Sequence, residues 1–311
     1  MSINILYAGA ATEWPVYRQE LGAALEAAGL IAELHDDPAR AAEVDYIVYA
    51  PDGPVSDFRP FTRARAVLSL WAGVEAIAPN PTLTQPLARM VDPSLTEGMV
   101  EWVTGHVLRH HLGIDASLTC QDGVWAPAIP PLARERTVGI LGLGVLGAAC
   151  ASALAGLNFD VAGWSRRPRQ LPGVRGLSGS KGLTEILERS EILVLLLPLT
   201  SETDGLICSE TLAHLPRGAV LLNPGRGPLI DDDALLAALA SGRLAHATLD
   251  VFRVEPLPPA HPFWSDPRIT VTPHIASATR PPSAARAIAE NIRRGEAGLP
   301  FLNLVDRAAG Y

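Results

Sequence analysis

The chain has 311 residues, which suits two domains of ordinary size or a single large one. Hydrophobic residues make up 48% and charged residues 19%, a composition typical of a globular protein with a full core. The net charge of −8 excludes a general attraction to phosphate backbones or anionic lipid, so we expect neither a nucleic acid nor a membrane as partner.

The three cysteines, Cys120, Cys150 and Cys208, are widely spaced and form no CxxC pair. This argues against a disulfide framework and against a cysteine zinc site. The first seven residues lack the basic region and long apolar core of a signal peptide. No apolar run reaches the roughly 18 residues that span a bilayer. We therefore expect a cytoplasmic protein with no metal site.

The N-terminal part of the chain alternates strand and helix patterns. Short apolar runs predict strands over 3–8, 45–50 and 66–70, and helical spacing predicts a helix over 14–28 that ends near Gly29. This alternation indicates a parallel sheet. A longer helix is predicted over 93–112, where Ser94–Glu97 resembles a capping box. A proline-containing loop with Trp125 follows.

A second strand–helix series begins at residue 137. The apolar patterns predict helices over 145–157 and 231–239 and a C-terminal helix over 283–294. The same patterns predict strands over 137–141, 160–164, 192–197, 219–223, 247–251 and 270–272.

A G-x-G-x-x-G motif follows the first strand of this series and opens the next helix. Gly142 permits the tight turn, Gly144 lets the backbone approach a pyrophosphate, and Gly147 lets the helix pack on the strand. The helix N-terminus also presents free amides to phosphates. Glycines serve ordinary turns too, but the strand and helix on either side predict a dinucleotide site.

The residues after the next strand bear on the choice of cofactor. An acid at this strand end binds the ribose 2′-hydroxyl of NAD, but Asp160 lies at the strand's start and Ser165-Arg166-Arg167 follows its end. A hydroxyl with two guanidinium groups suits a 2′-phosphate. A solvated basic turn is the alternative. We predict NADPH as the preferred cofactor, with NADH possible.

Three further segments follow strands of the second series: Asn223–Gly227, Asp250–Pro256 and Thr272–Ala276. Together with the glycine motif, their order N-x-x-R-G, D-V-F-x-x-E-P and P-H-I-A resembles the D-isomer-specific 2-hydroxyacid dehydrogenase family. The resemblance covers essentially the whole chain. Leu68–Val74 and Val91–Met99 are most similar to the glyoxylate/hydroxypyruvate reductase A branch of that family.

The resemblance implies three catalytic residues. Arg226 would hold the substrate carboxylate and polarise its 2-oxo group, a task that suits a planar cation. His274 would be the general acid that protonates the carbonyl oxygen. Glu255 would pair with His274 and favour its charged form.

The resemblance also implies substrate and cofactor contacts. Trp71, Ala72 and Gly73 would bind the substrate carboxylate together with Arg226 and His274. Asp250 would face the nicotinamide end of the cofactor. The remaining expected cofactor contacts are Gly142, Gly144, Val145, Leu146, Gly147, Ser165, Arg166, Arg167, Pro198 and Asn223.

Each of these residues also has a purely structural interpretation. Arg226 alone is typical of a surface ion pair, Glu255 of a turn, and His274 of a histidine at a strand end. Trp71 either shapes the pocket or packs in the core. His106, His110 and His111 lie outside the family pattern and lack partner ligands, so we interpret them as structural.

The resemblance implies two Rossmann-like, doubly wound α/β domains with a cleft between them. The cofactor domain would span 98–277, and the substrate domain would combine 1–97 with 278–311. Because the family commonly dimerises through the cofactor domain, we expect a homodimer.

The predicted activity is reduction of a small 2-oxo acid such as glyoxylate or hydroxypyruvate to the 2-hydroxy acid. One alternative is a dehydrogenase of another substrate on the same fold, such as an enzyme that oxidises 3-phosphoglycerate or phosphite. The lack of an extra C-terminal regulatory domain argues against 3-phosphoglycerate. A second alternative is a nucleotide-sensing binding protein, but the lack of long interaction tails argues against it.

Overall fold

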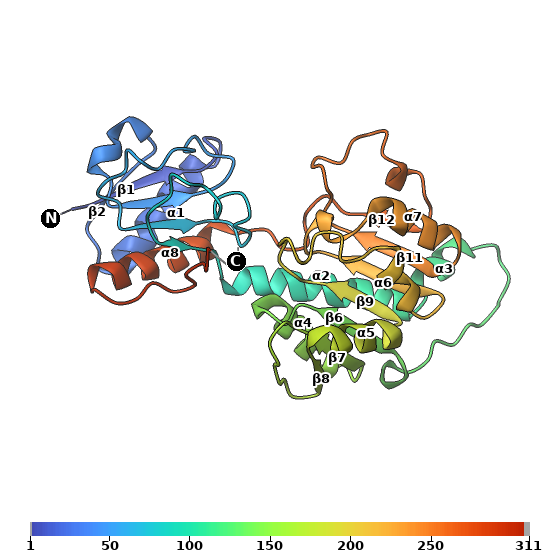
Figure 1. Cartoon of the computed structure of the whole chain (residues 1–311). Coiled ribbons are helices and arrows are strands. Elements are labelled where there is room, and N and C mark those ends of the chain that lie inside the picture. The colour runs from blue at the N-terminus through green and yellow to red at the C-terminus, as the bar shows by residue number, and fades with distance from the viewer. Residues whose placement is uncertain (1, 308–311) are drawn as a thin grey trace. The chain divides into compact units, whose positions relative to one another are not determined.

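The computed structural model describes residues 2–307 and divides the chain into two compact units (Figure 1). The split unit comprises the residues up to Leu95 and those from Thr279 onward, and the central unit is Thr96–Ala278. Residue 1 and residues 308–311 of the predicted substrate domain lie outside the described residues. The assignment of 98–277 to cofactor binding and of the flanking segments to substrate binding stays a prediction.

The split unit is built on a five-stranded parallel sheet in the order β2-β1-β3-β4-β5. Buried apolar side chains on one face of this sheet pack against α1 and α8, and those on the other face pack against the segments that connect the strands. The element bounds are β1 (Ile3–Ala8), α1 (Trp14–Ala27), β2 (Ala32–His35), the 3-10 helix η1 (Pro38–Glu43), β3 (Tyr46–Tyr49), β4 (Ala66–Ser69), β5 (Leu87–Ala88) and α8 (Pro281–Glu296).

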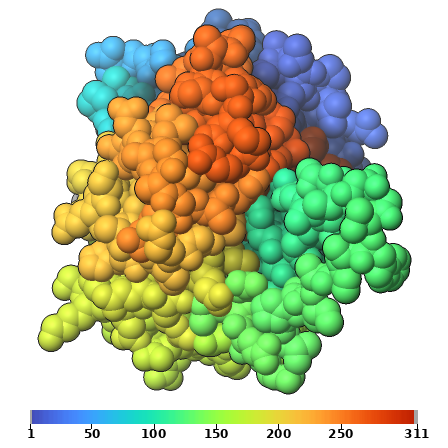
Figure 2. Space-filling model, turned by 90° about the vertical axis from the view of Figure 1, so that its right-hand side faces the viewer, coloured from blue at the N-terminus to red at the C-terminus, as the bar shows by residue number. Residues whose placement is uncertain are grey.

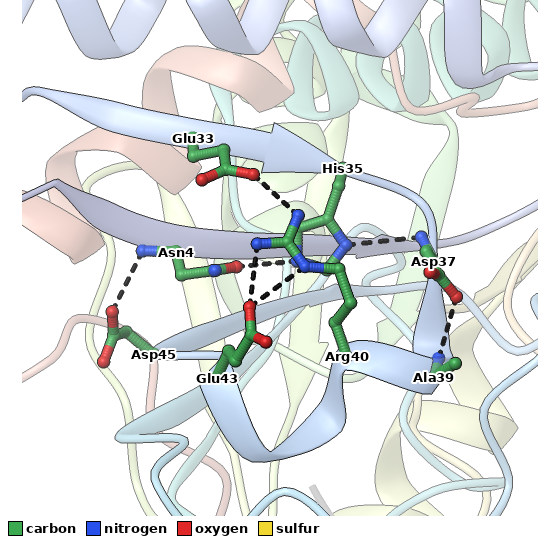
Figure 3. A network of polar contacts seen from close by, with 8 residues as sticks. All are labelled: Asn4, Glu33, His35, Asp37, Ala39, Arg40, Glu43 and Asp45. Atoms are coloured by element: carbon green, nitrogen blue, oxygen red, sulfur yellow. Dashed lines mark hydrogen bonds and ion pairs between the residues drawn. The ribbon is translucent and has the colours of Figure 1, made fainter.

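A network of polar side chains ties β1 and β2 to η1 (Figure 3). The Arg40 guanidinium contacts Glu33 at 2.6 Å and Glu43 at 2.9 Å. His35 Nε2 lies 2.6 Å from Asn4 Oδ1, and burial lowers the pKa of His35. The one guanidinium of this network, that of Arg40, is therefore paired with two carboxylates.

The central unit contains a seven-stranded parallel sheet in the order β12-β11-β10-β9-β6-β7-β8. Chain order reverses between β6 and β9, and ligands of open sheets bind at such a switch point. The element bounds are α2 (Pro93–His111), α3 (Ile114–Thr119), η2 (Ala133–Glu135), β6 (Thr137–Leu141), α4 (Val145–Gly156), β7 (Asp160–Trp164), β8 (Val174–Leu177), α5 (Gly179–Arg189), β9 (Ile192–Leu195), α6 (Ser209–His214), β10 (Ala219–Asn223), η3 (Gly227–Leu229), α7 (Asp232–Ala240), β11 (Leu244–Leu249), η4 (Pro262–Trp264) and β12 (Ile269–Val271).

Helices cover both faces of the central sheet, so the unit is doubly wound. One buried cluster joins the sheet to α5, α6 and α7, and a second joins it to α2 and α4. The predicted fold class, two α/β domains with parallel sheets, is confirmed. No helix within residues 2–307 is long and apolar enough to cross a membrane.

Some predictions of local structure were wrong. The capping box at Ser94–Glu97 is not formed: α2 begins at Pro93, and Asp92 Oδ1 accepts from Ser94 N at 2.7 Å. The strand predicted over 247–251 is β11, which begins three residues earlier and ends two earlier. The prediction also missed β2, β5, β8, α3, α5 and α6, which are short, exposed or interrupted by glycine.

Candidate functional site

The glycine motif forms the turn between β6 and α4. Gly142 has φ +105°, and a Cβ there would lie 2.4 Å from the Leu196 carbonyl oxygen. A Cβ on Gly147 would lie 1.8 Å from the Gly142 oxygen, so both positions require glycine. A Cβ on Gly144 would meet nothing within 4 Å. The open space at Gly144, at the N-terminus of α4, fits a pyrophosphate, and packing within the chain does not explain this glycine.

The residues on either side of this turn are accessible to a ligand. Val145 is exposed and Leu146 half-buried at the start of α4. Pro198 follows β9, the strand beside β6, and its carbonyl accepts from Thr203 Oγ1 at 2.7 Å. These expected cofactor contacts therefore lie at the ends of the two central strands.

The basic turn after β7 lies beside the glycine turn. Ser165 Oγ donates to the Arg167 carbonyl at 2.7 Å, which closes the turn, and the Arg166 and Arg167 side chains are exposed. Gly142 N donates to Trp164 O at 2.8 Å, so this turn adjoins the glycine turn. Arg169, which sequence analysis missed, donates through Nη1 to the Leu143 carbonyl within the glycine turn.

The arginine loop after β10 is held by a buried asparagine. Asn223 is 0% exposed; its Oδ1 accepts from Gly225 N at 3.1 Å and its Nδ2 donates to Arg226 O at 2.9 Å. A Cβ on Gly227 would lie 2.0 Å from the Phe252 carbonyl carbon, so glycine is required there. Asn223, expected as a cofactor contact, uses both side-chain groups to fix the backbone on either side of Arg226.

His274 and Glu255 form a hydrogen-bonded pair. His274 Nδ1 lies 2.7 Å from Glu255 Oε2, and Glu255 Oε1 accepts from Phe252 N at 2.8 Å. A carboxylate only accepts, so Nδ1 carries the proton of this bond and Nε2 is left for other chemistry. The His274 side chain is 51% exposed, so a substrate can reach it.

Asp250 organises the loop that carries His274. Its carboxylate is buried and accepts from Thr272 Oγ1 at 2.5 Å and from the amides of Ile275 and Ala276, each at 2.9 Å. Backbone hydrogen bonds from Asp250 N to Asn223 O and from His274 N to Asp250 O join the ends of β10, β11 and β12. The three motif segments therefore meet at one edge of the sheet. The expectation that Asp250 faces the nicotinamide stays a prediction.

The loop after β4 in the split unit presents unused amides. Ser69 Oγ accepts from Trp71 N at 3.1 Å, and Met90 N donates to Trp71 O. No group within residues 2–307 accepts a hydrogen bond from the amides of Ala72 or Gly73. Free consecutive amides at the carboxyl end of a strand suit an anion. The Trp71 residue is 44% exposed, which excludes the interpretation as a core residue.

The three histidines of α2 make hydrogen-bonding and packing contacts within the central unit. His110 Nε2 lies 2.9 Å from Thr248 Oγ1, and its ring lies against His246. The His106 ring packs on Trp102 and the His111 ring on Phe159. Among the residues that the structure describes, no group of three or more His, Cys, Asp or Glu side chains is placed to hold a metal.

Residues 105–276 match the family model described as "D-isomer specific 2-hydroxyacid dehydrogenase, NAD binding domain". This match covers more than half of the chain and all four motif segments. The chain belongs to the D-isomer-specific 2-hydroxyacid dehydrogenase family. It is therefore an NAD(P)-dependent oxidoreductase. The glycine motif lies within the part of the chain that matches the family's NAD-binding domain.

Relatives of this dehydrogenase include the glyoxylate/hydroxypyruvate reductase A of Serratia proteamaculans, which is 42% identical over 80% of this chain and 82% of its own. A family member from Xanthobacter autotrophicus Py2, solved with NADPH and MES, is 43% identical with a TM-score of 0.91 over both whole chains. The NADPH-dependent glyoxylate/hydroxypyruvate reductase of Sinorhizobium meliloti, solved with NADP and sulfate, is 36% identical with a TM-score of 0.88, again over both whole chains. The predicted similarity to the reductase A branch is confirmed.

Proposed function

We propose that this dehydrogenase reduces short 2-oxo acids, such as glyoxylate and hydroxypyruvate, with NADPH. The observation that carries the proposal is the His274–Glu255 pair, which the buried Asp250 carboxylate anchors beside the arginine loop. The names of the Serratia and Sinorhizobium relatives support the same substrates.

The proposed proton donor is His274. A bound nicotinamide cofactor supplies a hydride to the 2-oxo carbon. His274 Nε2 gives a proton to the carbonyl oxygen, while Glu255 holds Nδ1 and fixes the plane of the ring. The carboxylate of Glu255 stabilises the charged imidazolium from which that proton leaves.

The substrate carboxylate needs donors of its own. We assign Arg226 to the carboxylate and the 2-oxo group, since a guanidinium can donate two parallel hydrogen bonds. The free amides of Ala72 and Gly73 would add two neutral donors. Trp71 would cover the bound acid.

NADPH is the proposed cofactor because of the turn after β7. Ser165 places no negative charge beside the adenosine ribose, and Arg166 and Arg167 supply two exposed cations. Solved relatives that contain NADPH or NADP support this choice.

We also propose that two chains associate through the central unit. After α3, residues 120–132 run as an extended loop in Figure 1, and in Figure 2 the green atoms of this region form a distinct mass on the surface. Trp125 is 95% exposed and Ile129 92% exposed in this segment. Apolar exposure on this scale is typical of a protein interface.

The cysteine pattern favours a cytoplasmic location.

The catalytic proposal is tested by Arg226→Ala and His274→Gln. Each is expected to lower kcat/KM for glyoxylate by about a hundredfold or more, because transition-state contacts or the proton donor are lost. NADPH affinity, measured by fluorescence titration, is expected to change little. The exposed residues Arg217 and His214 provide the matched controls Arg217→Ala and His214→Gln. Wild-type turnover in both active-site variants would contradict the proposal.

A further inference from the structure

Among the described residues, Arg89 differs from the paired arginines of the split unit, and from its exposed arginines that lack an ion pair, such as Arg18 and Arg286, in being half-buried without an ion pair. Arg40, Arg63 and Arg65 each contact a carboxylate, at 2.6 to 2.9 Å. Within residues 2–307 the guanidinium of Arg89 makes no ion pair and no hydrogen bond. Its residue is nevertheless half-buried, and burial is the one cause that shifts its pKa, downward. The guanidinium is thus partly shielded from water without gaining a partner among residues 2–307.

Such a group is unfavourable unless something else compensates it. A cation that loses hydration must be paired or hydrogen-bonded, and a partly buried unpaired charge lowers the stability of the folded chain. Exposed arginines avoid this by reaching into solvent. An unpaired, half-buried guanidinium therefore points to an anion that is not part of the chain.

The position of Arg89 identifies where that anion lies. Leu68 on β4 pairs with Ala88 on β5, so the next residues, Ser69 and Arg89, are neighbours at the strand ends. The Ser69 hydroxyl caps the loop at Trp71, and Met90, the residue after Arg89, donates to the Trp71 carbonyl.

Strand alternation indicates the face on which the Arg89 side chain lies. Leu87 packs in the cluster that also contains Val67 and Val74, whereas Ala88 and Met90 pack in the opposite cluster, against α1 and α8. Continued one residue past the end of β5, this alternation would place the Arg89 side chain on the Leu87 face, the face on which Val74, in the loop with the unused amides, also packs.

We propose that Arg89 is a second guanidinium contact for the carboxylate of the 2-oxo acid, and that with the amides of Ala72 and Gly73 it makes the anion site of the split unit. The inference rests on the proposed function and adds a residue to it. A guanidinium that donates two parallel hydrogen bonds would select for a carboxylate over a neutral group at that end of the substrate.

The test uses Arg89→Met, Arg89→Lys and the control Arg63→Met, which removes a paired arginine from the same unit. Binding of oxalate, a non-reacting dicarboxylate, to the enzyme–NADPH complex is measured by calorimetry, alongside KM and kcat for glyoxylate and the unfolding temperature. We expect oxalate affinity to fall, and KM to rise, about tenfold to a hundredfold in Arg89→Met, less in Arg89→Lys and not in the control.

Stability separates this role from a structural one. Since methionine removes an uncompensated charge, the ligand-free Arg89→Met protein is expected to unfold at the same temperature as the wild type or higher. Unchanged oxalate affinity, or a lower unfolding temperature with kcat and KM impaired together, would overturn the proposal. Oxalate binding does not require turnover, so a wild-type enzyme that binds oxalate through Arg89 but leaves glyoxylate unreduced would contradict the proposed function alone.

Discussion

At the scale of single residues, the His274 loop depends on one buried carboxylate. His274 has φ +53°, a left-handed conformation that costs a non-glycine residue on the order of 1 kcal/mol. Asp250 compensates by accepting three hydrogen bonds from the same loop. The position of the imidazole therefore depends on a residue that is itself almost fully shielded from solvent.

Asp250→Asn tests this dependence. An amide offers one acceptor oxygen in place of two, so at least one donor of the loop loses its partner at a cost of about 1–3 kcal/mol. We expect kcat for glyoxylate to fall about tenfold or more and the unfolding temperature to drop, as followed by steady-state kinetics and calorimetry. A variant with wild-type kcat would show that the loop holds its shape without the carboxylate.

The basic turn carries the prediction on cofactor choice. In Arg166→Ala/Arg167→Ala, the loss of charge-assisted hydrogen bonds to a 2′-phosphate should raise KM for NADPH about tenfold to a hundredfold and leave KM for NADH nearly unchanged. Adding Ser165→Asp to this double variant should lower KM for NADH, because a carboxylate there can bind the ribose 2′-hydroxyl. Equal effects of the double substitution on both cofactors would mean that the turn is only a solvated surface loop.

Some residues of the candidate site could be predicted from the sequence and others could not. Gly142, Arg226, Glu255 and His274 lie in spaced motifs, and the structure brings the last three to one sheet edge. Arg89 could not be singled out, because its significance is the absence of a partner, which depends on contacts between distant segments. The same is true of the hydrogen bonds that Asp250 and Asn223 make.

At the scale of elements, the contact between α2 and β11 contains uncharged histidines. Burial lowers the pKa of His110 from 6.5 to about 3, and it lowers the pKa of His246 and His106 as well. The rings of His110 and His246 touch and bond to Thr248 and Thr270. Protonation of these buried rings therefore opposes the contact.

This makes the stability of the central unit sensitive to acid. Because the unfolded chain takes up protons on these histidines first, stability is fully present above pH 6.5 and is lost as pH falls toward the lowered pKa values. Each histidine contributes a slope of up to about 1.4 kcal/mol per pH unit in that window. Thermal unfolding of His110→Gln between pH 5 and 8 should show a shallower slope than the wild type.

The exposed His214→Gln variant is the control for that experiment. Its slope is expected to match the wild type, because the His214 side chain is 39% exposed and lies outside the α2–β11 contact. An unaltered slope in His110→Gln would mean that the α2–β11 contact does not depend on a neutral His110.

The elements of the fold were predictable where a pattern was long and buried. The helices α1, α2, α4 and α8 and the strands β1, β6, β7 and β10 follow apolar periodicity closely. The short edge strands β5 and β8 bury too few side chains for a pattern to develop. The start of α2 at Pro93 was predicted correctly, but the capping box at Ser94 was not formed, because Asp92 precedes the helix and its Oδ1 accepts from Ser94 N.

At the scale of the whole molecule, the segment 112–132 exposes more apolar surface than an isolated chain needs. Seven large hydrophobic side chains are exposed along it: Leu112, Ile114, Leu118, Val124, Trp125, Ile129 and Leu132. We expect a dimer by light scattering, and Trp125→Ser/Ile129→Ser should weaken it at micromolar concentration. If the double variant keeps the mass of the wild-type dimer, the interface lies elsewhere. Val16→Ser, which changes an exposed residue of the split unit, is the control.

Steady-state oxidation of NADPH and NADH with glyoxylate and hydroxypyruvate tests the proposed reaction most directly. We expect turnover with both acids and a higher kcat/KM with NADPH than with NADH. We also expect His274→Gln to remove the turnover without removing NADPH binding. Tight NADPH binding with no reduction of either acid would contradict the proposed reaction.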